Sequence, residues 1–250
     1  MLRSNISTVY NQIAYWRVFP AIYAAAVTVA GSLLLDVFSP ITIFIAFFTT
    51  LSIYNINSLY DVDEDKINNP NNADFALQNR RLVTTLVVIS SVVAICLSVF
   101  GGIYTPFVVL LCLVSGILYS AKKYRIKNIL LLNTVLVAVT LSVIATVIPV
   151  TFTGESNSTK LFIIFFYFIV KFAITVEICN IPDIDGDKRT GVTTLPIVLG
   201  VSKTKWLLYG LEIGSFGFLI GSVLFGHISA AVLVVFGIPM GYSLWTIYIT

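Results

Sequence analysis

Apolar residues dominate this chain in long runs that short polar segments interrupt. Eight of these runs are each long enough to cross roughly 30 Å of hydrocarbon as a helix. They cover residues 13–35, 39–60, 82–100, 103–121, 128–150, 160–181, 204–226 and 228–250. The pattern predicts an all-α, polytopic transmembrane helical bundle of about eight spans, with residues 1–250 forming a single domain.

The composition agrees with a membrane protein. Of the 250 residues, 58% are hydrophobic and 11% are charged, whereas charged residues make up roughly 25% of ordinary soluble domains. The first run carries Arg17 and lacks a small-residue cleavage site, so we expect it to be a span rather than a signal peptide. Membrane lipid is the expected environment. Nothing in the chain indicates binding to nucleic acid or an obligate protein partner.

The basic residues lie in alternate loops between the runs. Those between runs two and three, four and five, and six and seven are Lys66, Arg80, Arg81, Lys122, Lys123, Arg125, Lys127, Lys188, Arg189, Lys203 and Lys205. Arg3 precedes the first run, and the opposite loops hold only Lys160. Because Lys and Arg favour cytoplasmic loops, this distribution predicts a multi-pass protein of the cell membrane whose basic face is cytoplasmic.

Two acidic blocks lie on this same expected face, although the chain has only 12 Asp and Glu. The first is Asn57-Ser-Leu-Tyr-Asp61-Val-Asp-Glu-Asp65, at the end of run two. The second is Asp183-Ile-Asp-Gly-Asp187-Lys, after run six. Carboxylates gathered at a membrane surface are typical of cation binding.

The spacing within each block favours one shared site. Asn57, Asp61 and Asp65 follow at intervals of four residues, which places them on one face of a helix, whereas Asp63 and Glu64 point elsewhere. Asp183 and Asp187 repeat the interval. Four carboxylates from two helix ends are the oxygen ligands that Mg²⁺ takes, with positions left for phosphate oxygens.

Three other interpretations compete for these blocks. A solvated helix end is the commonest fate of an acidic run, but two blocks with matching spacing on one face disfavour it. A calcium loop of the EF-hand type fails, because Lys66 stands where glycine is needed and Asn72 where glutamate is needed. A transport site usually has its carboxylates near the membrane midplane on broken helices.

Basic and aromatic residues accompany the acidic blocks. Tyr119 and Lys123 end run four with the same four-residue interval, and Arg80 and Arg81 close the first polar loop. Each group alone is typical of a cytoplasmic anchor; beside the carboxylates, some of them are suited to hold a polyanion such as diphosphate. Arg17, near the cytoplasmic end of run one, either extends to the surface or belongs to the site.

Two charged residues, Lys171 and Glu177, fall inside run six. Charges in the membrane interior are costly and are usually paired or functional. Their spacing of six residues does not place them on one helical face, so a mutual ion pair is not expected.

These motifs together resemble the UbiA superfamily of intramembrane prenyltransferases. The resemblance covers about residues 10–205. It rests on the pattern at Asn57, Asp61 and Asp65, on the Tyr119 and Lys123 pair, and on the stretch from Asp183 to Gly200. The last stretch is the most specific and is most similar to the archaeal branch that makes digeranylgeranylglyceryl phosphate, followed by homogentisate and chlorophyll-type enzymes. Asn79-Arg80-Arg81-Leu82 stands where the family has a Pro-Leu-Pro-Ser-Gly run.

The resemblance implies a bundle of usually nine spans around a central cavity open to lipid. It also implies two Mg²⁺ ions that bridge the aspartates and the diphosphate of an isoprenyl donor. The expected catalytic and metal-binding residues are Asp61, Asp65, Asp183 and Asp187. The expected diphosphate-binding residues are Asn57, Arg17, Lys66, Arg80, Tyr119, Lys123 and Lys188.

The resemblance therefore implies a Mg²⁺-dependent transfer of an isoprenyl chain to a lipophilic acceptor, through ionisation to an allylic carbocation. The acceptor is geranylgeranylglyceryl phosphate or an aromatic quinone precursor. The alternative is a cation-coupled membrane transporter that uses the acidic helix ends as an ion site. A phospholipid-alcohol transferase is disfavoured, because the chain lacks the single-block signature of that class.

Overall fold

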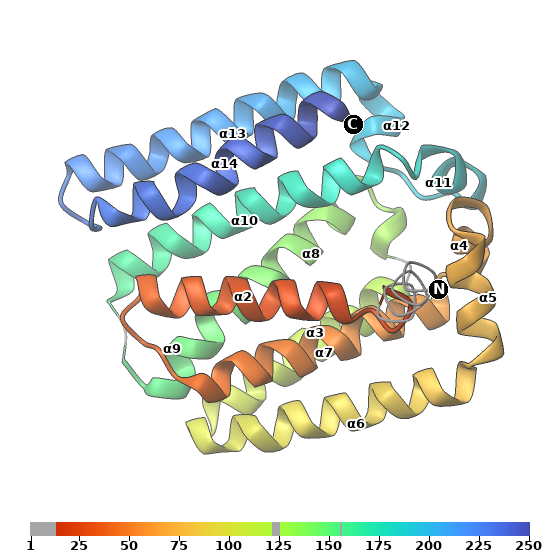
Figure 1. Cartoon of the computed structure of the whole chain (residues 1–250), viewed down its shortest axis with the longest axis horizontal. Coiled ribbons are helices and arrows are strands. Elements are labelled where there is room, and N and C mark those ends of the chain that lie inside the picture. Colours follow the sequence, from red (N-terminus) through yellow and green to blue (C-terminus); the bar gives the residue numbers. More distant parts are fainter. Residues whose placement is uncertain (1–13, 122–125, 156) are drawn as a thin grey trace, which may run out of the picture.

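The structure is a computed structural model that describes residues 14–121, 126–155 and 157–250. The described part of the chain is helical and contains no strand. Long helices lie side by side, and four short helices gather at one end of the bundle (Figure 1). The expected all-α fold is confirmed.

Six helical stretches are long and apolar enough to cross a membrane, among the residues described. They are α3 (Pro40–Tyr60), Arg80–Gly101 with α6 (Arg80–Ser98), Leu132–Thr153, α10 (Ser158–Asn180), α13 (Val201–Leu224) and α14 (Ala231–Ile249). Two shorter apolar helices, α2 (Val18–Leu34) and α7 (Tyr104–Ser120), complete the pattern. The first and last residues of each helical stretch lie within a few residues of the ends of one of the eight predicted apolar runs.

The stretch Leu132–Thr153 is not one regular helix. It consists of α8 (Leu132–Ser142), a wider π-helical segment at Val143–Val147, and α9 (Ile148–Thr153). The segment approaches α2 closely, because a Cβ at Gly31 would lie only 2.3 Å from the carbonyl oxygen of Ala145. A larger residue than glycine at position 31 would therefore push the two backbones apart.

Several buried hydroxyl groups in the bundle donate to carbonyls of their own helices. Thr28 Oγ1 donates to the carbonyl of Ala24, and Ser142 Oγ donates to the carbonyl of Ala138, at 2.8 and 2.7 Å. This bonding removes the cost of placing a polar group in an apolar interior.

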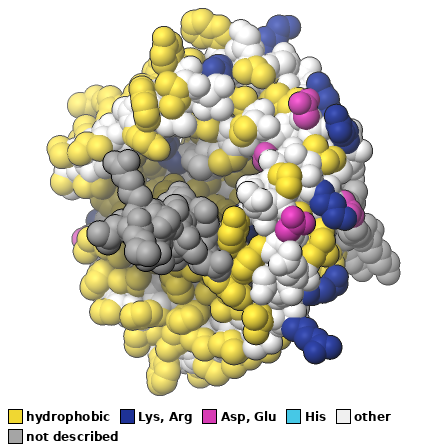
Figure 2. Space-filling model, turned by 45° about the vertical axis from the view of Figure 1, so that its right-hand side comes forward, with side chains coloured by type: hydrophobic (Ala, Val, Ile, Leu, Met, Phe, Trp, Pro, Cys, Tyr) yellow, Lys and Arg dark blue, Asp and Glu magenta, His cyan; other side chains and the backbone are white. Residues whose placement is uncertain are grey.

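The short helices form the polar end of the molecule. They are α4 (Val62–Asn68), α5 (Pro70–Gln78), α11 (Ile184–Thr190) and α12 (Leu195–Leu199). Lys, Arg, Asp and Glu side chains gather on this side, while hydrophobic side chains cover much of the remaining visible surface (Figure 2). The charged loops thus come together at one end, as the alternation of basic loops predicts.

Candidate active site

The first acidic block bends the chain at Asp61. Helix α3 ends at Tyr60 and α4 begins at Val62, because Asp61 has φ −92° and ψ 16°. The four-residue ladder nevertheless continues: Asp61 N donates to Asn57 O at 2.9 Å, and Asp65 N donates to Asp61 O at 2.8 Å. The predicted interval is therefore kept through the bend.

The second block repeats this arrangement. Helix α10 ends at Asn180, before Pro182, and α11 begins at Ile184 with Asp183 as its N-cap. The Asp187 N–H donates to the carbonyl of Asp183 at 3.0 Å. Both blocks thus consist of a long helix, an aspartate at the bend, and a short helix with a second aspartate one turn further on.

The short helices α4 and α11 pack against each other, and they lie together at the polar end (Figure 1). Gly186 makes this packing possible, since a Cβ there would lie 2.1 Å from Asn68 Oδ1. Asn68 Nδ2 also donates to the carbonyl of Asp183 at 3.4 Å. The contact brings both aspartate pairs to one place.

The end of α7 joins the same place. Ser120 Oγ donates to Asn57 Oδ1 at 3.1 Å. The Tyr119 hydroxyl interacts electrostatically with Asp61 and Asp187, one aspartate from each block. The end of α7 therefore lies beside Asn57, with Tyr119 close to an aspartate of each block.

Arg17 also belongs to this region. Its Nη2 donates to Asp65 Oδ2 at 3.3 Å, and both side chains are largely buried. Its backbone has φ 57°, a left-handed conformation that residues other than glycine rarely adopt. Such strain at a polar cluster is typical of functional positions. Of the two alternatives that the sequence left open, this contact with Asp65 favours a position of Arg17 in the site.

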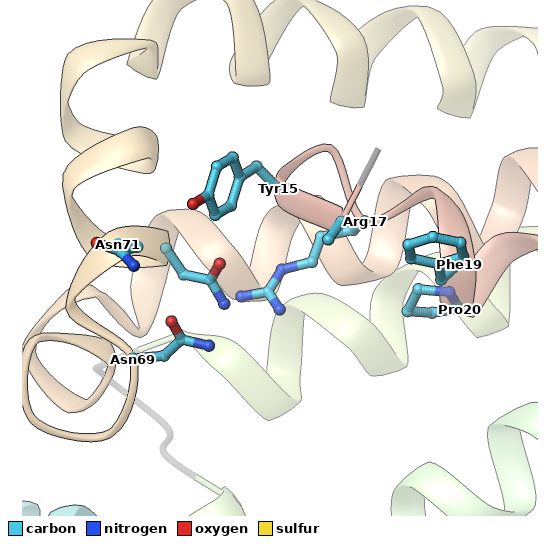
Figure 3. Close-up of a pocket in the computed structure, with 8 residues that line it drawn as sticks. Tyr15, Arg17, Phe19, Pro20, Asn69 and Asn71 are labelled. Atoms are coloured by element: carbon cyan, nitrogen blue, oxygen red, sulfur yellow. The ribbon is translucent and has the colours of Figure 1, made fainter. Parts of the chain in front are cut away.

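A cavity of about 410 Å³ lies beside Arg17. Tyr15, Phe19 and Pro20 line one part of it, and the amides of the polar loop line another. The Arg17 guanidinium points towards Asn69 and away from Phe19 and Pro20 (Figure 3). The cavity therefore combines one cation with neutral donors close to Asp65.

Three of the expected basic residues lie apart from the aspartate pairs. Lys66 is half-exposed and pairs with Asp63 at 3.7 Å. Arg80, at the start of α6, and Lys188, in α11, are exposed, and no side-chain bond to the aspartates is seen for them within the described ranges. Lys123 lies outside the described residues.

The position of Glu64 differs from the sequence-based interpretation, in which its side chain points away from the site. It is buried, with 5% of its surface exposed, and it interacts electrostatically with Tyr119. The interval of three residues from Asp61 also places side chains on neighbouring positions of a helix, so the signal was present. Asn68 was missed as well, because its role depends on the packing of α11.

The donor set fits Mg²⁺, which takes carboxylate and amide oxygens. In the described part of the chain, however, no group of three or more His, Cys, Asp or Glu side chains lies close enough together to hold a metal ion as it stands. Arg17 is bonded to one of the candidate ligands, Asp65. Burial raises the pKa of Asp183 above its ordinary value of 3.8, because it disfavours the ionised carboxylate. A cation bound beside Asp183 would favour that ionised form.

The two charged residues inside α10 have separate partners. Lys171 Nζ donates to Glu212 Oε1 of α13, and Ser243 Oγ of α14 donates to Glu212 Oε2 at 3.1 Å. Glu177 accepts bonds from Thr134 of α8 and from Asn180. The expectation that Lys171 and Glu177 do not pair is confirmed.

Comparison with known sequences identifies the family. A sequence profile of the UbiA prenyltransferase family matches residues 17–250, so the chain belongs to that family. Its curated relatives include digeranylgeranylglyceryl phosphate synthase of Sulfurisphaera tokodaii, 32% identical over 160 residues, which are 62% of this chain and 55% of the relative. Another is the probable chloroplastic homogentisate phytyltransferase 2 of Oryza sativa subsp. japonica, 26% identical over 82% of this chain and 51% of the relative. The chain spans about half the length of these relatives.

Solved structures show the same fold. A UbiA homologue from Archaeoglobus fulgidus bound to DMAPP and Mg²⁺ matches with a TM-score of 0.71 at 16% identity, over 95% of this chain and 85% of that chain. A structure described as giving insight into digeranylgeranylglyceryl phosphate synthase in membranes matches with a TM-score of 0.66 at 18% identity, over 97% of this chain and 87% of that chain. The chain thus has the fold of these UbiA homologues, and its long apolar helices are those of a multi-pass membrane protein.

Proposed function

We propose that this protein transfers an isoprenyl chain from an isoprenyl diphosphate to a lipophilic acceptor. The observation that carries the proposal is the packing of α4 against α11, which gathers the two aspartate pairs, with Tyr119 in electrostatic reach of both blocks. Family membership supports transfer chemistry. The A. fulgidus homologue bound to DMAPP and Mg²⁺ has the same fold, which supports a diphosphate donor and a metal.

Asp61, Asp65, Asp183 and Asp187 are the residues that would hold two Mg²⁺ ions. When bound, such ions neutralise the charge that develops on the departing diphosphate. Arg17 is placed to contact the same diphosphate, since its guanidinium already meets one carboxylate of the set. Once the guanidinium is released from Asp65, its two parallel N–H groups would donate hydrogen bonds to phosphate oxygens. The bond between Ser120 and Asn57 holds the end of α7 against the first block.

The apolar bundle has a role beyond anchoring. A diphosphate held at the polar end leaves the isoprenyl chain on the membrane side, among hydrophobic helices. Exclusion of water there protects an allylic carbocation until the acceptor attacks it. The relatives support two acceptor classes: geranylgeranylglyceryl phosphate and an aromatic quinone precursor of the homogentisate type.

The site is expected on the cytoplasmic side of the cell membrane, because the basic loops gather at the polar end of the bundle. A cation-coupled transporter is the weaker explanation. Transporters place their carboxylates near the midplane, whereas both aspartate blocks lie where long helices end.

The test is turnover by the purified protein in lipid nanodiscs, with radiolabelled geranylgeranyl diphosphate, Mg²⁺ and extracted lipids as acceptors. We expect diphosphate release and a labelled lipid product. Asp61→Asn and Asp183→Asn should each abolish both while the protein stays folded, since each removes a metal ligand. Asp185→Asn is the matched control, because Asp185 is exposed between the two aspartates of the second block. Near-normal turnover by Asp61→Asn would rule out the proposed metal site.

A further inference from the structure

Glu177 is the buried acid of the membrane interior whose charge the proposed function leaves unexplained. It is 2% exposed and lies in the last turns of α10. Its partners in the described part of the chain are neutral: Thr134 Oγ1 donates to Oε1, and Asn180 Nδ2 donates to Oε2 at 3.2 Å. Glu212, also fully buried, differs because Lys171 pairs with it.

This contrast has an energetic meaning. A carboxylate in an apolar interior is costly unless a cation compensates it, and such residues in membrane helices usually serve a function. The ion pair of Glu212 lowers that cost and ties α10 to α13 and α14. The partners of Glu177 named above provide hydrogen bonds but no charge.

The hydrogen-bond pattern fits both protonation states. With Glu177 ionised, Thr134 donates to Glu177, while Asn133 Oδ1 accepts from the Thr134 N–H at 2.6 Å. With Glu177 protonated, the carboxyl donates to Thr134 Oγ1, whose own proton turns to Asn133 Oδ1, 3.0 Å away. Asn180 donates to Oε2 in either case. No buried donor loses its partner when the proton arrives.

The position of Glu177 also suits the reaction. It precedes Asp183 by six residues: α10 continues for three of them, to Asn180, and a turn then leads to Asp183 at the start of α11. With the diphosphate at the aspartates and the isoprenyl chain in the membrane, the reacting carbon lies on the membrane side of Asp183. Glu177, in the last turns of α10, lies on that same side of Asp183 along the chain.

We propose that Glu177 is the proton acceptor of the transfer step and receives the proton through the Thr134 hydroxyl. This inference rests on the proposed prenyl transfer. The bond between the isoprenyl carbon and the diphosphate oxygen breaks, and its electron pair leaves with the diphosphate. The acceptor supplies an electron pair to form the new bond to that carbon, and its displaced proton passes to the Glu177 carboxylate, which later returns it to solvent.

The decisive measurement is the partition of one radiolabelled donor between acceptor product and prenyl alcohol, the product of water attack. Glu177→Gln should lower transfer to the acceptor by about 100-fold, within the range known for general bases, while donor ionisation continues and yields prenyl alcohol. Glu177→Asp should recover part of the transfer. Unchanged partition in Glu177→Gln would overturn the inference and leave the proposed function standing, whereas wild-type protein that neither releases diphosphate nor forms product would overturn both.

Two further variants keep the test informative. Glu212→Gln removes a buried glutamate that has a cation partner; it should lower the melting temperature without changing the partition. Thr134→Val keeps the Glu177 carboxyl and removes the hydroxyl bonded to it, so it serves even when Glu177→Gln does not fold. We expect transfer by Thr134→Val to fall at least tenfold, with donor ionisation kept; wild-type partition in this variant would contradict the proton path.

Discussion

At the scale of single residues, two groups of the candidate site have contacts or a pKa that differ from those that the proposed binding of Mg²⁺ and diphosphate requires. Arg17 meets Asp65, a proposed metal ligand, at 3.3 Å. Asp183 has a pKa raised by burial. In both cases the fold places a charged group where it is partly removed from water, which costs free energy of folding. Each case leads to a prediction about a substitution.

Replacing Asp183 with Asn should stabilise the metal-free protein at neutral pH. The raised pKa means that the folded state binds the proton more tightly than the unfolded state. This contribution to stability is present below the ordinary value of 3.8 and is lost as pH rises through the folded value. Asn removes the cost of the buried charge. Melting curves without metal should therefore shift upward at pH 7 and stay almost unchanged at pH 3.

The same Asp183→Asn variant should lose the stabilisation that Mg²⁺ and an isoprenyl diphosphate give to wild-type protein, because binding to the folded state raises its apparent stability. Asp185→Asn, at an exposed position, should keep that stabilisation. A ligand-induced melting shift of wild-type size in Asp183→Asn would exclude Asp183 as a metal ligand.

Arg17→Ala should raise KM for the isoprenyl diphosphate by roughly 10- to 100-fold, since a hydrogen bond to a charged group contributes about 1.5–3 kcal/mol. Steady-state kinetics with varied donor concentration measures the change. Lys203→Ala, at an exposed position of α13, removes one positive charge outside the site and should leave KM within threefold. Equal effects of the two substitutions would show that Arg17 acts only through net charge.

At the scale of elements, the apolar runs predict where the long helices lie, because periodicity and length are local properties of the chain. The interval of four residues likewise predicts which aspartates share a face. The sequence cannot predict contacts between distant segments. Asn68 meets Gly186, and Lys171 meets Glu212, only because α4 packs on α11 and α10 packs on α13. The same limit hid the neutral surroundings of Glu177.

The contact between α4 and α11 can be tested at Gly186. A methyl group there would collide with the Asn68 side chain and disturb its bond to Asp183. We expect Gly186→Ala to weaken Mg²⁺-dependent donor binding, measured by calorimetry, and Gly186→Ala with Asn68→Ala to restore part of it. Gly210→Ala is the control, because a methyl group at Gly210 meets nothing within 4 Å. Additive effects of the two substitutions would show that the residues act independently.

At the scale of the whole molecule, the distribution of charge predicts orientation in the membrane. Lys, Arg, Asp and Glu side chains gather at the polar end (Figure 2), which we expect to face the cytoplasm. Single cysteines at Asn72 and Thr190, in a chain without its three native cysteines, should react with a membrane-impermeant reagent only from the cytoplasmic side. A cysteine at exposed Glu155, beyond the opposite end of α10, should react only from the other side. Labelling of Asn72 and Thr190 from opposite sides would contradict the shared site, because the two aspartate blocks must face the same compartment to hold one diphosphate.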